Sequence, residues 1–433
     1  MTRIIAHITL ECATALKVGS NNLDALQDSP IQRDWNGLPM ILGTSLAGIL
    51  RKKFSDKKGE EEIFGSEAKE TSNQDSKDES KGSKIFFSNA LLIDENNQVT
   101  ENLLLEKSPF LQHFLALPIR EHTAITHKGV AKEDSKFNAE VVYKGARFKF
   151  RMEMLIENDA DENTFFEILD FLKDETLRIG SGGTKGRGKI KVLKIEYGKF
   201  DENSEDYDNL SSSLNENYCA LPEYSAFFHY KLCLIPEDFF IFGSGGGDED
   251  ADHIGVTESI IDYENKKLTE QKILIPASSI KGALSQRTSF YYNQLKGEFI
   301  ENNQDLPQQR VVEIFGSEKD EKKESSKGKL ILSDIYCKKV KLENQKVFTH
   351  VKIDDFTGGG MDGALFQEKT DTLEESFVLE IWLKNDVEKT ALKAFELALK
   401  DLAKGALALG GGSNKGHGFF QGTITKIWRK ELC

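Results

Sequence analysis

Two glycine-rich segments that each carry a lysine are the parts of the chain best suited to contact an anion. Residues 180–188 read GSGGTKGRG and residues 410–418 read GGGSNKGHG. Glycines present backbone N–H groups with little side-chain obstruction, so a phosphate can approach them closely. We therefore predict phosphate contacts in both segments, from Gly183, Lys185, Arg187, Lys415 and Gly416. The alternative is a tight turn before a final strand. Neither segment has the GxxxxGK(S/T) spacing of a nucleotide hydrolase.

Two helix starts form a second pair of candidate anion sites. Thr44-Ser45 and Ser278-Ser279 precede helical patterns and have the side chains that cap a helix N-terminus. The free N–H groups of that end attract anions. We predict contacts from Ser45 and Ser279, helped by the basic side chains of the same helices: Arg51, Lys52, Lys53, Lys281 and Arg287. Ordinary capping with a solvated basic face is the alternative.

These features belong to a long internal repeat. Residues 43–51 (GTSLAGILR) return as residues 277–285 (ASSIKGALS), and EIFGSE occurs at 62–67 and again at 313–318. KIFFSN at 84–89 corresponds to KLILSD at 329–334. An ordered set of repeated phrases is the signature of homologous modules in tandem. We predict a first module over residues 1–200, an acidic, Ser/Asn-rich linker over 201–222, and a second module over 223–433.

Within each module the pattern predicts strand, helix, strand, strand, helix, strand. The first strands are expected at 4–15 and 226–235, the first helices after the Ser/Thr pairs, and the next strands at 84–89 and 329–334. Strands at 145–156 and 376–384 precede helices at 162–177 and 386–402, and the last strands are expected at 189–195 and 419–427. This is the order of an α+β ferredoxin-like sheet, so we predict two tandem ferredoxin-like modules.

Composition limits the possible functions. The chain has 433 residues, no apolar run long enough to cross a membrane and no signal-peptide pattern at its start, so we expect a cytoplasmic protein without a membrane partner. Its five cysteines form no CxxC pair, which disfavours a disulfide framework or a zinc ribbon. The net charge of −14 disfavours a generally cationic surface, yet residues 178–199 hold seven basic residues against one acid. Backbone contacts to RNA need only such a local strip.

The proline-marked strand with its Ser-Ser helix start, the Ile-Phe-Gly element and the Lys-Gly-x-Gly loops together resemble the RAMP (repeat-associated mysterious protein) subunits of type III CRISPR effector complexes. The resemblance covers nearly the whole chain twice, and the tandem is similar to the fused backbone subunits of type III-D variants. It implies ferredoxin-like (RRM-like) modules that bind CRISPR guide RNA, meet a target single-stranded RNA and assemble with other type III subunits. It also implies an endoribonuclease of antiviral defence.

The same resemblance points to Asp28 as the catalytic residue. In the family, an aspartate opening an Asp-x-Pro-(Ile/Val)-x-(Arg/Lys)-Asp stretch cleaves target RNA, and residues 27–34 read QDSPIQRD. A loop carboxylate can orient or deprotonate a 2′-hydroxyl, or hold a divalent cation such as Mg²⁺, and Arg33 can neutralise developing charge. The alternative is that Asp28 caps a turn before Pro30. We assign no metal ligands.

The second module departs from this stretch, which leaves its cleavage competence open. Residues 258–262 read ESIID, without the proline and with Glu258 in the matching register. Asp252, Glu258 and Asp262 are all weaker candidates. The glycine run at 243–247 has no evident counterpart in the first module.

The resemblance assigns a thumb-like hairpin, which inserts between guide and target, to residues 119–143 and 350–368. It places His122 among the RNA contacts, although isolated surface histidines are the alternative. The leading interpretation is a guide-RNA-binding nuclease subunit. A non-catalytic scaffold or capping subunit is the second interpretation, and a carbohydrate or nucleotide enzyme is a third, disfavoured by the missing carboxylate pair, triad or Walker motif.

Overall fold

The first strand of each half is the centre of a sheet. A computed structural model of the protein describes residues 2–20, 30–54, 59–66, 80–99, 108–123, 135–201, 214, 216–219, 226–297, 309–317, 325–339 and 345–427. In the first module β1 (Thr2–Cys12) lies between β7 (Arg147–Ile156) and β8 (Ile190–Asp201), antiparallel to both. Alternate residues of β1, Ile4, Ala6, Ile8 and Leu10, are buried. This alternation is why the segment forms a strand with one face on the core.

Short strands extend this sheet beyond β7. They are β2 (Met40–Ile41), β3 (Ile85–Phe87) and β4 (Ala90–Leu92), and β9 (Glu216–Asn217) pairs with β8 at the other edge. The spatial order β4-β7-β1-β8 is that of a ferredoxin-like sheet. Within the predicted linker over 201–222, residue 201 is the last of β8, and β9 pairs with β8 in the first sheet.

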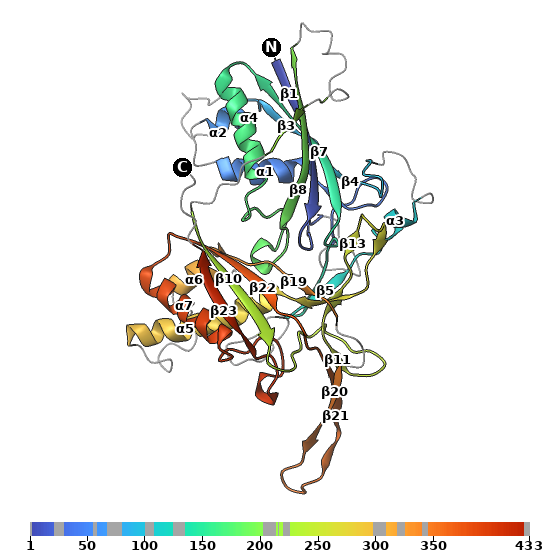
Figure 1. Ribbon diagram of the computed structural model, residues 1–433, viewed down its shortest axis with the longest axis vertical. Helices are drawn as coiled ribbons and strands as arrows, with labels where there is room; N and C mark the ends of the chain where they lie inside the picture. The colour runs from blue at the N-terminus through green and yellow to red at the C-terminus, as the bar shows by residue number, and fades with distance from the viewer. Residues whose placement is uncertain are drawn as a thin grey trace, which may run out of the picture.

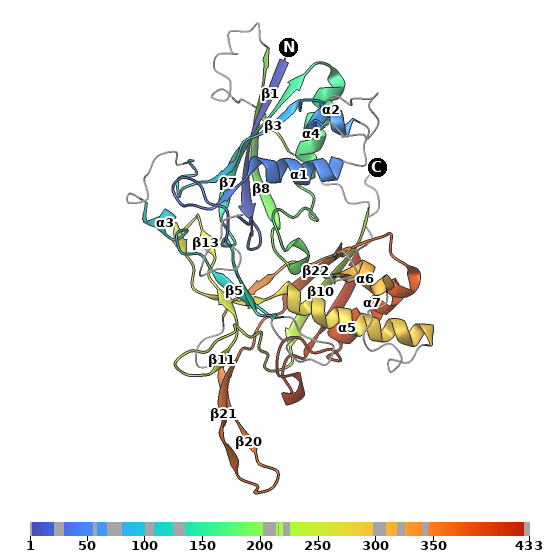
Figure 2. The same cartoon turned by 180° about the vertical axis from the view of Figure 1, so that it is seen from behind.

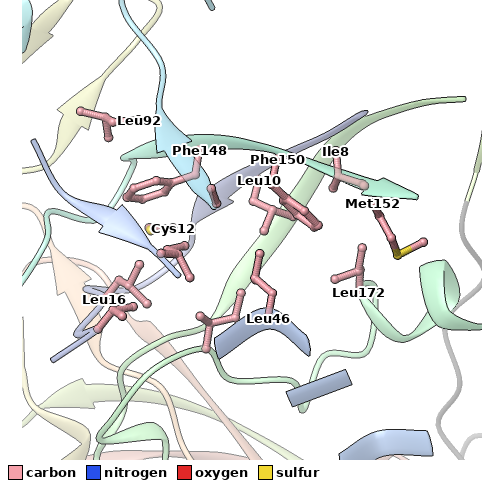
Figure 3. Close-up of a cluster of buried hydrophobic side chains, with 14 of the residues drawn as sticks. Ile8, Leu10, Cys12, Leu16, Leu46, Leu92, Phe148, Phe150, Met152 and Leu172 are labelled. Carbon is pink, nitrogen blue, oxygen red and sulfur yellow. The ribbon is translucent and has the colours of Figure 1, made fainter. Parts of the chain in front are cut away.

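Helices α1 (Gly43–Phe54) and α4 (Asp159–Phe171) cover one face of this sheet (Figures 1 and 2). The Asn158 side chain accepts a hydrogen bond from the Asp161 N–H and so caps α4. Leu46 of α1 meets Phe148, Phe150 and other inward-facing strand residues in the core (Figure 3). The short helices α2 (Glu60–Phe64) and α3 (Pro109–Gln112) complete the module.

The second module repeats the arrangement. Its central strand β10 (Phe227–Pro236) lies between β22 (Phe377–Lys384) and β23 (Phe420–Ile427), and the order β18-β22-β10-β23 matches that of the first sheet. The remaining elements of this core are β18 (Leu330–Ile331), α5 (Ala277–Lys296), α6 (Gln309–Phe315) and α7 (Lys389–Ala403). The predicted α+β class and the tandem ferredoxin-like order are confirmed.

Each module also carries a hairpin outside its sheet. In the first, β5 (Ile119–His122) pairs with β6 (Phe137–Glu140). In the second, β20 (Lys346–Ile353) pairs with β21 (Gly360–Thr370), and this hairpin projects far from the body of the molecule (Figures 1 and 2). We call them the first and second thumb hairpins. At the base of the second, β11 (His253–Ile254) pairs with β21.

The second half has further short strands, and some of them interlock with the first half. The short strands are β12 (Thr257–Glu258), β13 (Ile261–Asp262), β14 (Lys267–Leu268), β15 (Lys272–Ile275), β16 (Gly316–Ser317), β17 (Ser326–Lys327) and β19 (Ile335–Cys337). Ile261 and Tyr263 are buried in the hydrophobic core of the first module. The Tyr263 hydroxyl donates to the Ile93 carbonyl at 2.8 Å, and its ring lies 4.8 Å from that of Phe110. The first core is therefore completed by residues from beyond the predicted boundary.

None of the helices in the described part of the chain is long and apolar enough to cross a membrane.

Candidate nucleic-acid interface

The two glycine loops have one backbone conformation. Each contains a single turn of 3₁₀ helix, Gly183–Lys185 and Ser413–Lys415. A Cβ atom at Gly180 would lie 2.2 Å from the Lys17 carbonyl, and one at Gly410 would lie 2.3 Å from the Ile241 carbonyl. The positive φ values recur at equivalent positions: Gly180, Gly182, Gly186 and Gly188; Gly410, Gly412, Gly416 and Gly418. The repeated glycines are thus required by close packing and by φ, and each loop presents its lysine from a fixed turn.

In the first module, the loop lysine lies against the first thumb hairpin, at the pair farthest along β5 and β6 from Ile119–Glu140. The Lys185 ammonium is 5.5 Å from the ring centroid of Phe137. His122 pairs with Phe137 across the hairpin, and the two rings stack at 5.0 Å. The contact is a cation–π interaction. It joins the predicted phosphate loop to the predicted thumb.

The second module repeats this three-residue arrangement. Lys415 lies 4.7 Å from the ring centroid of Phe366, and His350, paired with Phe366 across the second hairpin, lies 5.0 Å from it. Here Glu368 adds a carboxylate that accepts from Lys415 at 2.8 Å and lies 2.8 Å from His350. Sequence analysis missed both aromatic residues. The register of the hairpins, which fixes each His–Phe pair, was the signal that could have found them.

The first glycine loop is docked on the second module. Its Gly186 carbonyl accepts from the Asp334 N–H at 3.1 Å, and a Cβ at Gly186 would lie 2.5 Å from the Ala277 Cβ at the start of α5. In the second loop, by contrast, the space around Gly416 is open among the described residues. Gly416 is thus exposed, whereas the equivalent Gly186 is buried where the first glycine loop contacts the second module. We call this contact between the modules the joint.

A buried ion cluster holds this joint. Arg120 of the first thumb hairpin donates to Glu258 at 2.8 Å and to Asp334 at 2.5 Å, and also to the Tyr336 hydroxyl at 3.0 Å. Burial lowers the pKa of Arg120, but Tyr336, Asp334 and Glu258 together raise it above its ordinary value. Both acids come from the second module. Removing one partner of such a buried cluster leaves an uncompensated charge, so its role is structural.

Several basic side chains lie close together beside the joint, and few acidic side chains are near enough to offset their positive charge. The pKa of Arg187, only 3% exposed, is lowered to about 10 by burial and by Arg120. The pKa of His122 is lowered to about 4 by burial and by Arg187, Lys185, Arg120 and Lys17. The pKa of Lys281 is lowered to about 8 by burial and by Lys185. The pKa of Lys17 is also lowered, by burial and by Arg187 and Lys185. An anion bound here would relieve this mutual repulsion.

The basic strip over 178–199 is less cationic than its sequence indicated. Lys189 pairs with Glu175 at 2.7 Å, and Lys194 pairs with Glu196 at 2.7 Å. Lys199 pairs with Glu162. Arg187 is buried beside His122, to which its Nη2 is hydrogen-bonded, so its side chain does not form the predicted surface contact. Lys185 remains the exposed cation of the loop.

The helix starts are capped from outside the helix. The N-cap of α5 is Pro276, without a side-chain cap, and Ser279 lies within the first turn. Instead, the Asp334 carboxylate accepts from the Ala277 N–H at 2.9 Å. The Asn89 amide oxygen accepts from the Gly43 N–H at 2.9 Å, which places Ser45 inside α1. Asn89 and Asp334, which end the repeated phrases KIFFSN and KLILSD, thus cap the two helices. The prediction that the Ser and Thr side chains at the helix starts are the caps is wrong.

Most basic residues of these helices have partners. Arg51 pairs with Glu60 at 2.7 Å, and Lys53 pairs with Asp174. Arg287 lies 3.3 Å from Asp401 and donates to the Ala406 carbonyl at 2.6 Å. Lys52 is exposed on α1, with Arg51 and Lys53 beside it in the last turn. The pairing favours a solvated, salt-bridged face over an open phosphate site.

Asp28 lies outside the described residues, but the strands on both sides of its loop are in place. Gly19 bridges Ile31, and Gly243 bridges Gly255, so the same number of residues separates the two bridge residues in each module. Hydrogen bonds repeat as well, from Gln32 N–H to the Val18 carbonyl and from Val256 N–H to the Phe242 carbonyl, both at 2.7 Å. The run at 243–247 therefore does have a counterpart, at 19–23.

This register makes Asp252 the counterpart of Asp28, because each stands three residues before the second bridge residue. The sequence comparison instead sets Glu258, six residues further along the chain, against Asp28. Asp252 is exposed and accepts from the Gln367 N–H of the second thumb hairpin at 2.8 Å. Of the three second-module candidates, it alone lies in the equivalent loop.

The other catalytic candidates have structural partners. Arg33 donates to the Gly37 carbonyl at 2.7 Å and pairs with Glu140 at 2.5 Å. Glu258 belongs to the buried cluster. Asp262 accepts from the Glu264 N–H at 2.9 Å and from the Asn265 N–H at 3.0 Å, as an aspartate that closes a turn does.

The residues that the structure describes form no group of three or more His, Cys, Asp or Glu side chains placed to hold a metal ion. Asp248 and Asp250, near Asp252, both bind Lys369, at 2.9 and 2.6 Å. One lysine thus partly neutralises the two carboxylates. The described residues offer no fit to the expected Mg²⁺.

Comparison with known proteins agrees with the repeat. A family model described as the RAMP superfamily matches the chain twice, over residues 9–191 and 241–421. A search of curated proteins finds no match. The first match begins within β1 and the second begins after β10, and both end inside the final strand of the respective sheet, β8 and β23. Membership of this superfamily implies an RNA-binding protein of a CRISPR system. The two matches together cover most of the sequence, and the chain therefore belongs to the RAMP superfamily as a tandem of two modules.

Proposed function

We propose that the chain is a guide-RNA-binding backbone subunit of a type III CRISPR ribonucleoprotein that cleaves guide-complementary RNA at loop aspartates. One observation carries the proposal: in each module the lysine of a glycine loop lies over the aromatic ring of a His–Phe pair in the thumb hairpin. Equivalent strand bridges flank the segments that contain Asp28 and Asp252. A site built twice at equivalent places fits a polymer that presents the same groups at regular intervals.

The RNA backbone is held by the loops. Lys185 and Lys415 supply charge, and the loop N–H groups supply donors, so binding is sensitive to phosphate and to salt. The uncompensated cations at the joint, Lys17 and Lys281 among them, extend the same surface between the modules.

Cleavage uses the aspartate loops. The carboxylate of Asp28, and of Asp252 in the second module, orients and deprotonates a target 2′-hydroxyl. The 2′-oxygen then attacks the adjacent phosphorus in line, a new O2′–P bond forms, and the P–O5′ bond breaks. The 5′-oxygen leaves and takes up a proton, and a cyclic phosphate remains.

Further subunits dock at the ends of the chain. The internal joint packs part of the first glycine loop, at Gly186, and part of the first thumb hairpin, at Arg120, against the second module. The corresponding surfaces of the second module, around Gly416 and on the second hairpin, are exposed, with Phe356 at its tip 98% exposed. A repeated head-to-tail interface leaves such free ends. By hairpin register, Phe348 stands where Arg120 does, so the next partner meets an aromatic rather than a cationic anchor.

The proposal is tested by purifying the protein from cells that carry a CRISPR array and sequencing the bound nucleic acid. We expect a discrete set of short guide RNAs, retained less well by the Lys185→Ala/Lys415→Ala double variant than by Lys400→Ala, an exposed control on α7. Absence of bound RNA, or RNA of random sequence, contradicts the proposal. Bound guides without target cleavage in the assembled complex favour the scaffold interpretation.

A further inference from the structure

Trp35 is the most exposed large apolar side chain of the first module. It is 89% exposed, whereas Trp382 is buried and stacked on His229 at 3.8 Å. We infer that Trp35 is a stacking platform for a nucleobase of the RNA that the first module binds. The inference rests on the proposed function and adds a base contact to it.

The turn that carries Trp35 is rigidly held. The Asp34 carboxylate accepts from the Asn36 N–H at 2.8 Å and from the Leu38 N–H at 2.9 Å. Arg33 also stabilises the turn, because its guanidinium donates a hydrogen bond to the Gly37 carbonyl at 2.7 Å. The positive φ of Gly37, 77°, closes it. An aromatic ring on a fixed turn loses little entropy when a base stacks on it.

The same anchor connects the turn to the first thumb hairpin. Arg33 pairs with Glu140 of β6, and Glu140 also accepts from the Ile31 N–H at 3.1 Å. Arg33, expected to assist catalysis, thus holds Trp35 in a fixed position relative to the thumb and the end of the Asp28 loop.

The location favours RNA over a protein partner. Residues 31–33 pair on one side with the segment that contains Lys17, through the bridge Gly19–Ile31. On the other side they pair with residues 38–40, through the bridge Arg33–Pro39. Adjacent strands are about 4.8 Å apart, which places the turn roughly 10 Å from the backbone of Lys17. The uncompensated cations beside Lys17 attract phosphates, and the loop that bears Asp28 ends at the same strand. A base of the bound strand is therefore within reach of the indole.

Only the first module has this platform. By the register of the bridges, Ser259 stands in the second module where Trp35 stands in the first. Base–aromatic stacking tolerates any base and contributes about 1–3 kcal/mol per base. The first module thus contacts both phosphates and a base, while the equivalent turn of the second module lacks the base contact.

Fluorescence of the full chain tests the inference. The chain has three tryptophans. In a Trp428→Phe variant only two of them remain, the exposed Trp35 and the buried Trp382, so a change in fluorescence on RNA binding can be assigned to Trp35. Titration with single-stranded oligo(A) RNA is expected to quench the emission, and the quenching is expected to disappear in Trp35→Phe. Trp35→Ala is expected to weaken RNA binding about 5- to 150-fold with an unchanged salt slope, since no phosphate contact is lost. Phe290→Ala, exposed on α5, is the control and should bind normally.

The outcomes separate the inference from the function. RNA binding by the wild type without quenching, and with Trp35→Ala as tight as the control, overturns the platform. Loss of a co-purifying protein in Trp35→Ala, with RNA affinity unchanged, also overturns it and makes the turn a protein interface. Absence of RNA binding by the wild type contradicts the proposed function itself.

Discussion

Lys185 and Lys415 face aromatic rings, and this arrangement leaves the ammonium groups able to bind phosphate as well. Cation–π contact orients a lysine without neutralising it. Lys415 differs from Lys185 because Glu368 already pairs with it at 2.8 Å. The two equivalent lysines are therefore expected to contribute unequally.

Replacing either lysine with alanine should reduce the salt dependence of RNA binding. For Lys185→Ala we expect the slope of log K against log salt to fall by about 0.7, the value for one single-strand phosphate contact. For Lys415→Ala we expect a smaller change, since Glu368 competes for the charge. Filter binding across a salt series measures both. Slopes equal to that of Lys400→Ala for both variants would show that the loops are only turns.

The depressed pKa of His122 predicts acid sensitivity of the fold. Its folded pKa is lowered to about 4 from 6.5 by burial and neighbouring cations, so the unfolded chain binds the proton first and stability falls as the pH drops from 6.5 to 4. The shift corresponds to about 3 kcal/mol, which screening at this half-buried site reduces to about 1–2 kcal/mol. Urea unfolding of the wild type and His122→Gln at pH 7.5 and pH 4.5 measures it. The variant should lose less stability, and equal losses contradict the assignment.

The apolar pattern and the internal repeat of the sequence predicted most helices and strands of the two sheets. They did not predict the contacts between elements that are far apart in the sequence. The long strands of the two sheets, β1, β7, β8, β10, β22 and β23, overlap the strand ranges predicted from the sequence, whereas β9, the exposed pair Glu216–Asn217, has no apolar pattern. The cap from Asn89 to Gly43 was not predicted, since it joins residues 46 positions apart. The match of Asp28 to Asp252 was also missed, because only the strand bridges fix that register.

Gly186 and Gly416 provide a matched test of the docked loop. Both have positive φ, 98° and 87°, so alanine strains the backbone at each. At Gly186 the new Cβ would also lie 2.3 Å from the Asp334 carboxylate and 2.5 Å from the Ala277 Cβ. We expect Gly186→Ala to lower the free energy of unfolding by about 1–3 kcal/mol more than Gly416→Ala. Denaturant titration measures the difference. Equal effects would show that the loop is not docked on α5.

For the whole molecule, the repeat indicated two self-sufficient modules, and the structure shows a shared core. Local pattern could not reveal this, because Tyr263 and Arg120 each act across the boundary between modules. Nothing near Arg120 in the sequence marks it as a buried ion-pair residue, because its partners Glu258 and Asp334 belong to the second module.

Tyr263 should therefore determine the stability of the half to which it does not belong in sequence. Tyr263→Ala removes a buried ring from the first core, and we expect a loss of about 3–5 kcal/mol. Tyr263→Phe keeps the ring but removes the hydroxyl, which donates to the Ile93 carbonyl and accepts from the Arg147 N–H, and should cost about 1–2 kcal/mol. Hydrogen exchange of β1 and β7 in the full chain should report the loss. Unchanged protection of these strands would contradict a shared core.

Mapping the cuts in a guide-complementary RNA, in the complex assembled with variant chains, tests the central claim most directly. Asp28→Asn and Asp252→Asn should each abolish one cut, by at least about 100-fold in rate, and leave target binding intact. The double variant should abolish both, and the turn-closing Asp262→Asn should cut as the wild type does. A 2′-deoxy nucleotide at either site should block the wild type at that bond. If the double variant cuts every bond at the wild-type rate, the two aspartate loops are not cleavage sites and the account is contradicted.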